Sequence, residues 1–459
     1  MSRFLACWLF SLGSQRGPFC QRERGYALPL ALMTGVILTI LAMTMYARSR
    51  TNSLTSLSQY RSGQSLAIAE GGIDRTLARL NQSSTSTLLR VNFSDWLNPE
   101  NIPLCYTTAT VSSILTQGTI GQGTYRVLDY QYNPLTRQGT IWVQGQVGQA
   151  VTQIQQTFPI ADDPSAFPAL LGTINVDLGN NNVFGELPGV DGNVVCTNPQ
   201  QCSVTCTPDS PPTAAQLRAA VGAGPNSIIT GRIFVGNAEV PPLPPVPAGA
   251  ISIGNINNSQ APLTLPRSTD DPITFTVNGE TITAFVYQAS SINLSGNDGK
   301  YLFLNTKDPH NKVSGSAQVP VYLYIDGNIT LSGNASIRTF TDSLPGYVRI
   351  YGNAPTSQTF SLNGNTCLNA FVFAPNASMG IQGGGSGGPC DTPAGDYGNP
   401  TPQCNITGAV WVKEWDGSNA TRPSVCVPPG LRQALGDLAI SFESQSGFVE
   451  AWQRLEANP

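Results

Sequence analysis

Acidic side chains are the first groups in this sequence that could do chemistry. Two carboxylates held several ångströms apart can cleave a glycosidic bond, one as acid and the other as base or nucleophile. The candidates all lie in the C-terminal half of the chain: Asp326, Asp391, Glu414 and Asp416. Turn chemistry explains two of them more simply, because Asp326 precedes a Gly-Asn pair and Asp416 precedes a glycine, which is a hairpin signal.

Other catalytic signatures are weak. The single histidine, His310, lies in a loop-like segment with no G-x-S-x-G nucleophile motif to accompany it. The glycine-rich run 383–388 lacks the lysine and the following helix of a phosphate-binding loop. The Asn/Asp turns do not have EF-hand or RTX-type calcium spacing. We therefore expect no enzyme activity, no metal site and no cofactor.

Two tryptophans raise the possibility of sugar binding. Trp411 and Trp415 are four residues apart, with Lys413 between them, so in a strand all three side chains would face the same side. Such a row could stack on sugar rings. The alternative is that both tryptophans belong to the hydrophobic core.

Cysteines point to an oxidising compartment. Two of the ten, Cys7 and Cys20, precede a long apolar segment, and eight follow it: Cys105, Cys196, Cys202, Cys206, Cys367, Cys390, Cys404 and Cys426. An even number in Gly- and Pro-rich surroundings favours disulfides over zinc, since no CxxC pair and only one histidine are present. The sequence does not determine the pairing.

The composition favours a β-rich exported protein. Charged residues make up 11% of the 459 residues, well below the roughly 25% of an average soluble domain. Short hydrophobic runs alternate with Gly, Pro and Asn, which is typical of short strands joined by turns. The net charge of −4 argues against a nucleic-acid partner, because phosphate binding needs a basic surface.

The elements that position these residues begin with an apolar helix. The 22 residues 26–47 contain no charge, whereas a bilayer needs roughly 20 helical residues. A cleaved secretory signal is the alternative, but its apolar core is shorter and ends at small residues. The cysteine-rich C-terminal part places the N-terminus inside and the rest outside the cytoplasm.

The helix is predicted to continue far beyond the membrane. No proline occurs from residue 49 to 80, and apolar residues recur at spacings of three and four: Leu66, Ala69, Ile73, Leu77 and Leu80. We expect one helix over 26–80, on the order of 80 Å long. The alternative is an ordinary signal anchor with a helical stalk.

A family resemblance rests on the ends of this helix. The run Gln21-Arg22-Glu23-Arg24-Gly25 before Tyr26 resembles a prepilin peptidase site, which implies a leader of residues 1–25 and cleavage after Gly25. The run 67–73, which contains Glu70, resembles the Ala-Ala-Glu-Ala-Gly stretch of minor pilins of the PilX kind. The chain thus resembles type IV minor pilins and pseudopilins, with a spine helix that supports a small sheet.

One position departs from that pattern. Most pilins carry glutamate as the fifth residue after the cut, where it neutralises the N-terminal amine of a neighbouring subunit in the apolar filament core. Here the fifth residue is Leu30, preceded by Pro29, which a first helical turn tolerates. The resemblance therefore implies a minor, tip or priming subunit rather than a repeating one.

The remaining chain is predicted to be mostly β-structure, giving an α+β class. Strands separated by Asn-Gly turns favour a β-solenoid, with a β-sandwich as the alternative. The runs AFVFAPNASMGIQGGG at 370–385 and GAVWVKEWDG at 408–417 carry a second resemblance. By these runs, residues 320–420 resemble a domain of pilin-anchored surface proteins, including cyanobacterial pseudopilins linked to polysaccharide secretion. We predict six segments: leader 1–25, helix 26–80, pilin-like β region 81–165, irregular connecting region 166–250, solenoid-like domain 251–428 and helical tail 429–459.

Three functions follow as hypotheses. The first is a minor pilin or pseudopilin that acts in assembly, priming or display, with other pilins, the prepilin peptidase and the inner membrane as partners. The second is a membrane-anchored adhesin or polysaccharide-binding protein. The third is a glycan-active enzyme. The predicted location is the inner membrane with a periplasmic domain, or the cell surface as part of a pilus.

Overall fold

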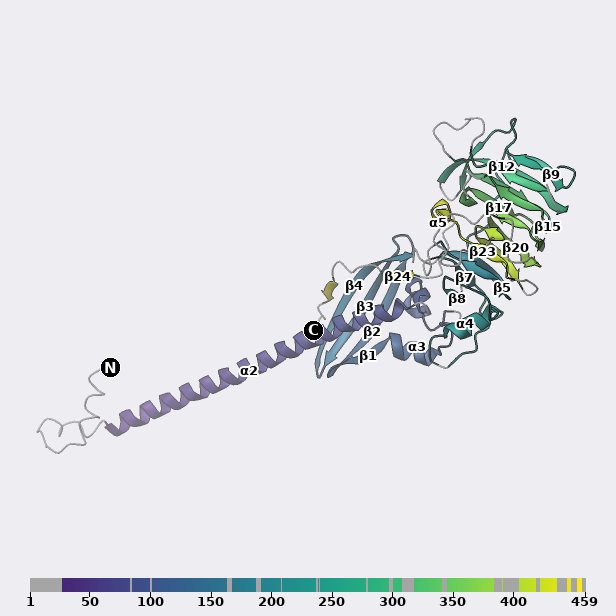
Figure 1. The fold of residues 1–459 in the computed structure, drawn as a ribbon. Helices are drawn as coiled ribbons and strands as arrows, with labels where there is room; N and C mark the ends of the chain where they lie inside the picture. The colour runs from purple at the N-terminus through teal and green to yellow at the C-terminus, as the bar shows by residue number, and fades with distance from the viewer. Residues whose placement is uncertain are drawn as a thin grey trace, which may run out of the picture.

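The computed structural model describes residues 27–82, 85–99, 101–162, 167–186, 191–207, 209–236, 238, 240–277, 280–296, 300–307, 318–340, 345–383, 390, 404–417, 422–435, 444–446 and 452–455. The predicted leader, its cleavage site, His310 and Asp391 lie outside these residues. The described chain consists of a long helix, a small antiparallel sheet beside its C-terminal part and a larger β-rich region beyond that sheet (Figure 1).

The long helix, α2, spans Ala27–Leu80 and has 54 residues, which corresponds to about 81 Å. It ends at the last residue of the predicted apolar stripe. From Leu28 to Arg61 its side chains are exposed, whereas Ala69, Ile73 and Leu80 are buried. The helix therefore has an exposed N-terminal part and a C-terminal part that packs against the rest of the structure. By length and composition it could cross a membrane.

A small region packs on the C-terminal part of α2. It consists of η1 (Ser86–Arg90), η2 (Phe93–Asp95), α3 (Thr108–Leu115), β1 (Gln117–Ile120), β2 (Gly123–Asn133), β3 (Gln138–Val147) and β4 (Ala150–Asp162). These strands pair antiparallel in the order β1-β2-β3-β4 and form the first sheet. Tyr125 and Val127 point to the helix, and a bulge at residue 128 shifts the next inward residue to Tyr130.

The β-rich region contains two sheets whose strands pair parallel, except that one strand of the larger sheet, Ile273–Val277, pairs antiparallel with its neighbour. The smaller sheet has the order β10-β13-β16-β19-β21-β23-β6. Its strands are β10 (Leu263–Leu265), β13 (Tyr301–Leu304), β16 (Ser336–Thr339), β19 (Cys367–Asn369), β21 (Ile406–Thr407), β23 (Ser424–Cys426) and β6 (Asn182–Phe184).

The larger sheet has the order β17-β14-β12-β15-β18-β20-β22-β5-β7-β8, and β9 and β11 also pair with β12. Its strands are β5 (Pro168–Asp177), β7 (Asn193–Cys196), β8 (Ile233–Val235), β9 (Ile251–Asn257), β11 (Ile273–Val277), β12 (Glu280–Gly296), β14 (Val321–Ile325), β15 (Ile329–Gly333), β17 (Val348–Gly352), β18 (Gln358–Gly364), β20 (Phe371–Gln382) and β22 (Val410–Asp416). The short η3 (Pro345–Tyr347) precedes β17.

Aliphatic columns form the core between the two sheets. In the larger sheet one column places Leu294, Leu331, Leu362 and Ile381 in register, and in the smaller sheet another runs through Leu302, Ile337, Leu368, Ile406, Val425 and Val183. All of these side chains are buried. The predicted class, a long helix followed by a β-rich region, is confirmed. Parallel stacking of successive segments is what a solenoid requires, whereas sandwiches pair antiparallel, so we keep the solenoid as our interpretation.

The segment predicted as an irregular connection is part of these sheets. Within 166–250, β5 lies between β22 and β7 in the larger sheet, and β6 ends the smaller sheet. The segment also contains helix α4 (Ala214–Ala220), which begins with a capping box at Thr213. The proline-rich stretch 240–247 then leads from β8 at one end of the region to β9 at the other (Figure 1).

The C-terminal tail also differs from its prediction. The predicted helical tail contains α5, which spans Leu431–Ala434. Two short strands, β24 (Ser444–Ser446) and β25 (Trp452–Leu455), then pair antiparallel with β4. The chain therefore returns to the first sheet, and the β-rich region is an insertion between β4 and β24 (Figure 1).

Candidate functional site

The uncharged part of α2 is suited to a nonpolar solvent. Its hydroxyl groups bond to carbonyls of the same helix: Thr34 Oγ1 donates to Leu30 O at 2.9 Å, Thr39 Oγ1 to Gly35 O at 2.8 Å and Thr44 Oγ1 to Leu41 O at 2.9 Å. A helix in a bilayer must satisfy its polar groups internally. These bonds therefore allow the three threonines of residues 28–47 to face lipid or other apolar helices without an unpaired hydroxyl group.

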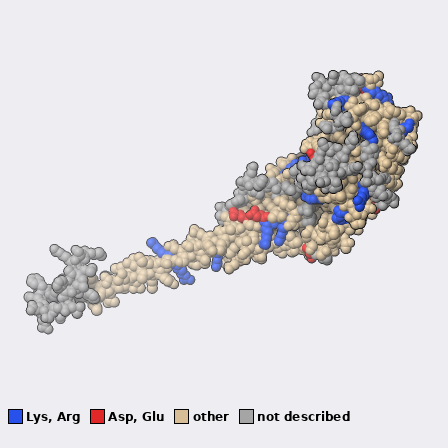
Figure 2. Space-filling view, in the orientation of Figure 1, with Lys and Arg blue, Asp and Glu red and all other residues tan. Residues whose placement is uncertain are grey.

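Positively charged residues follow the end of the apolar segment. Arg48 and Arg50 follow Ala47 directly, and both are exposed. Figure 2 shows Lys and Arg side chains on the helix beyond a stretch that has none. In a helix that crosses a bilayer, arginines at the end of the apolar segment lie at the level of the lipid headgroups and limit how deeply the helix inserts.

Close packing joins α2 to the first sheet. Ser65 and Thr152 share a buried hydrogen bond of 2.6 Å between their hydroxyls. Arg75 Nη1 donates to Thr119 O at 2.8 Å. A side chain at Gly145 would overlap the backbone of Ser65 and approach Ala69 N within 2.5 Å, so glycine lets the strand lie against the helix. The helix and sheet are therefore coupled through their backbones.

The predicted processing and filament residues fall into two groups. Gly25 and Tyr26 lie outside the described residues. Pro29 and Leu30 lie in the first turn of α2 with exposed side chains, and Glu70 is half-buried where the helix reaches the sheet. Their roles stay predictions.

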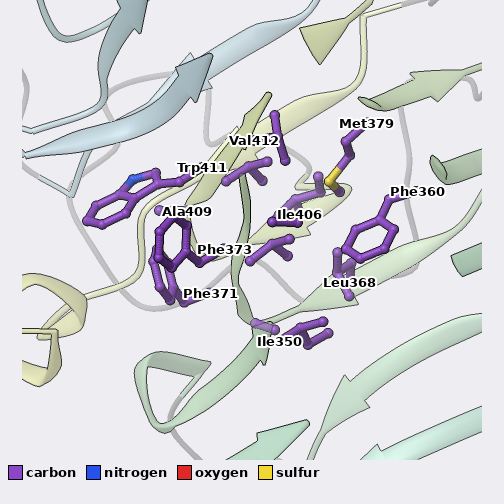
Figure 3. Close-up of a cluster of buried hydrophobic side chains, with 14 of the residues drawn as sticks. Ile350, Phe360, Leu368, Phe371, Phe373, Met379, Ile406, Ala409, Trp411 and Val412 are labelled. Carbon is purple, nitrogen blue, oxygen red and sulfur yellow. The ribbon is translucent and has the colours of Figure 1, made fainter. Parts of the chain in front are cut away.

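The structure corrects the prediction that the tryptophans contact sugar. Trp411 and Trp415 are each 1% exposed, so neither can stack on an external sugar ring. Trp411 Nε1 donates to Pro168 O at 2.8 Å, and its ring lies 4.7 Å from the Phe371 ring (Figure 3). The core alternative is therefore the correct one, and the sugar-contact prediction is wrong for both tryptophans.

The larger sheet explains this burial. Trp411 follows the aromatic row Tyr324, Tyr351 and Phe373 on neighbouring strands, so it extends a packed layer. Figure 3 shows Phe373 and Trp411 of this row. Lys413 lies at a bulge between residues 412 and 414, where its Nζ is 3.4 Å from Glu414 Oε1. The bulge lets both Trp411 and Trp415 pack inside while Lys413 stays partly exposed.

The candidate carboxylates take different positions. Asp326 accepts hydrogen bonds of 2.8 Å from Gln288 Nε2 and from Asn353 Nδ2, which stabilises a turn. Glu414 lies three strands further along the larger sheet, on the order of 14 Å away at the strand spacing. Glycosidase pairs are roughly 5–9.5 Å apart. Asp416 lies on the same strand as Glu414 and is exposed.

The eight predicted disulfide cysteines all form bridges. The pairs are Cys105–Cys206, Cys196–Cys202, Cys367–Cys390 and Cys404–Cys426. Three bridges lie within the β-rich region. Cys105–Cys206 connects the loop before α3 to the β-rich region across 101 residues of sequence.

A cleft of about 1840 Å³ lies beside that bridge. One wall comes from residues 99–108 of the first region, and the other comes from β8 and the start of α4. Its lining mixes apolar and polar side chains, including Tyr106, Leu217 and Phe234. Neither Glu414 nor Asp416 lines it.

Comparison with known proteins finds a similarity to one protein family in part of the chain. Residues 269–416 match the family described as "Domain of unknown function (DUF7305)". No curated protein of similar sequence was found.

Two solved structures are among those similar to the chain. One is an ice binding protein from an Antarctic biological consortium, with 13% identity and a TM-score of 0.31, covering 57% of this chain and 87% of that one. The other is the competence-associated pilin ComZ from Thermus thermophilus, with 14% identity and a TM-score of 0.24, covering 86% of this chain and 97% of that one.

Proposed function

We propose that this protein is a membrane-anchored minor pilin-like subunit that carries the β-rich region on the outside of the cell. Other pilin-like subunits are its partners, and their helices pack beside residues 28–47. The protein acts by assembly and display, and we propose no catalytic step.

The division of α2 is the observation that carries this proposal. Residues 28–47 are uncharged and exposed, while Ala69, Ile73 and Leu77 of the same helix are buried against the first sheet. A plain anchor with a stalk does not require its helix to be coupled to a sheet. Here the Ser65–Thr152 bond and Gly145 couple them, so a force on the helix reaches the outer regions directly.

The sequence around residue 30 supports a minor position. Leu30 offers no carboxylate to a neighbouring N-terminal amine, and an unpaired charge in an apolar filament core is costly. A tip or priming subunit has no neighbour above it and needs no such carboxylate. The inserted β-rich region also adds bulk at the far end of the molecule, which a tip accommodates more easily than a repeating shaft (Figure 1).

N-terminal mass spectrometry tests the proposal. In cells that contain a prepilin peptidase, we expect the mature chain to begin at Tyr26. The variant Gly25→Ala should accumulate with residues 1–25 attached, because the peptidase needs glycine at the cut. Gly35→Ala is the matched control, since a side chain at this position on the helix meets no neighbouring atom.

The same measurement separates the alternatives. An intact Met1 in the wild-type protein from such cells would contradict the filament proposal and favour a plain membrane-anchored adhesin. Cleavage elsewhere, at small residues after residue 40, would identify a secretory signal instead.

A further inference from the structure

Three aromatic rings and one arginine form a patch on the outer face of the smaller sheet. We define this aromatic patch as Tyr301, Phe303, Phe340 and Arg338. In β13 the side chains of Leu302 and Leu304 are buried, whereas Tyr301 and Phe303 are half-buried. Because successive side chains of a strand point to opposite faces, Tyr301 and Phe303 face away from the core.

The rings are continuous. The Tyr301 and Phe303 ring centroids lie 5.5 Å apart, and those of Phe303 and Phe340 lie 5.3 Å apart. The Phe340 side chain is 41% exposed. This gives a strip of three linked rings on a flat sheet, with each step close to the length of one pyranose residue in a linear glycan.

Arg338 adds a directed hydrogen-bond donor to the strip. It lies beside Phe303 on the neighbouring strand, and its Cζ is 4.9 Å from the centre of the Tyr301 ring. The Arg338 side chain is partly exposed, although its Nε is buried and has no hydrogen-bond partner among the described residues. Stacking on Tyr301 holds this partly exposed guanidinium side chain beside the strip, and carboxylates are the acceptors that fit a guanidinium group best.

The surrounding charge favours an anion. Lys300 precedes Tyr301 in the chain and donates from Nζ to Asn258 O at 3.2 Å, so a second cation lies at the start of this strand. On the described part of the face seen in Figure 2, the end of the β-rich region far from the helix shows Lys and Arg side chains and hardly any Asp or Glu. Figure 1 shows β9 and β12 at this same end.

The size of the patch favours a sugar over a protein. A stable protein interface buries about 800 Å² on each partner, far more than two half-buried rings, one exposed ring and an arginine offer. A pyranose ring presents an apolar face of C–H groups that fits an aromatic ring, while its edge carries oxygens that accept hydrogen bonds. We propose that the aromatic patch binds an acidic polysaccharide, with sugar rings on the aromatic strip and a carboxylate that accepts from Arg338. This goes beyond the proposed function, since it holds whether or not the helix enters a filament.

Affinity electrophoresis of the full chain in neutral detergent micelles tests the proposal. Native gels are cast with polygalacturonate, with alginate or with neutral dextran. We expect the two acidic glycans to retard the wild-type protein and dextran to leave it unaffected. Phe340→Ala and Arg338→Gln should each weaken the retardation about tenfold, the loss typical of one strong contact. Salt should weaken wild-type binding more than that of Arg338→Gln.

The controls are Tyr60→Ala and Arg126→Gln, an exposed aromatic residue and an exposed arginine outside the β-rich region. Both should bind like the wild type. Phe340 is the primary aromatic variant because its exposed ring leaves little cavity, and near-ultraviolet circular dichroism checks the fold.

Four outcomes would overturn the proposal. They are no retardation by either acidic glycan, retardation that the patch variants leave unchanged, equal retardation by dextran, and a patch variant that alters only the oligomeric state. The last would identify a protein interface. Because N-terminal processing is measured separately, a failure here leaves the filament proposal standing.

Discussion

Small residues decide how the helix meets the first sheet. The apolar stripe predicted from sequence is the buried one, since Ala69, Ile73, Leu77 and Leu80 are all in the core of this region. Such a stripe is predictable because it depends on local periodicity. The need for Gly145 was not predictable, because it comes from the approach of Ser65, 80 positions earlier in the chain.

Gly145→Ala tests this contact. The added methyl group has to displace helix backbone rather than a flexible side chain, so we expect the free energy of unfolding to fall by about 1–3 kcal/mol. Urea unfolding followed by tryptophan fluorescence, to which Trp96 buried in this region contributes, provides the measurement.

Gly63→Ala is the matched control for that experiment. Gly63 lies on the exposed side of α2 with no atom near its missing side chain, so alanine should stabilise the helix by roughly 0.5–1 kcal/mol. Equal effects of the two substitutions would contradict the close packing at Gly145.

Trp411 and Trp415 show a second limit at this scale. Alternation along a strand indicates which side chains share a face, but it does not say which face is covered. Phe167 and Pro168, far away in sequence, cover Trp411. The aromatic patch was missed for a related reason. Tyr301 and Phe303 alternate visibly with leucines, but their proximity to Arg338 and Phe340 appears only when the strands stack.

At the scale of elements, long ones were predictable and short ones were not. The helix over 26–80 was predicted from its period, and the predicted β region 81–165 contains the long strands β2 and β3. In contrast, β6, β7 and β8 have three or four residues each, too few for a period to emerge. Their stability comes from parallel neighbours supplied by distant parts of the chain.

The tail strands give a prediction at this scale. β24 and β25 cover the outer edge of β4, so a chain that stops after Leu435 should leave the amide groups of that edge unpaired. Hydrogen-exchange mass spectrometry should then show faster exchange in peptides from β4, while those from β1 at the opposite edge stay unchanged. Unchanged protection of β4 would show that the tail does not hold that edge.

At the scale of the whole molecule, the two regions are joined in several places. The chain passes from β4 into the β-rich region, returns to β24, and is linked again by Cys105–Cys206. The sequence indicated that disulfides form but gave no pairing, because residues 101 positions apart carry no local signal of contact. The sequence also did not show that the β-rich region is an insertion between β4 and β24, because this depends on which strand the last two strands pair with.

The loop sizes of two bridges lead to a prediction about stability. In the chain-entropy description, a bridge across about 100 residues contributes about 4.7 kcal/mol, and one across a loop of six or seven residues contributes about 2.4 kcal/mol. Replacing both Cys105 and Cys206 by alanine should therefore lower the free energy of unfolding more than replacing Cys196 and Cys202, whose separation is six. Urea unfolding without reductant compares the two variants. An equal or smaller loss for the first pair would mean that the long-range bridge does not restrict the unfolded chain.

Because the chain returns to β4, the strands of the first sheet cannot all be made at the same stage of synthesis. A ribosome makes β24 and β25 after every strand of the β-rich region, and an export machine that moves the chain from its N-terminus delivers them last as well. The first sheet therefore stays open until the inserted region has emerged. A chain interrupted anywhere in that region presents a bare β4 edge, which proteases and chaperones can recognise. The first sheet can therefore be complete only after the whole β-rich region has been made and delivered.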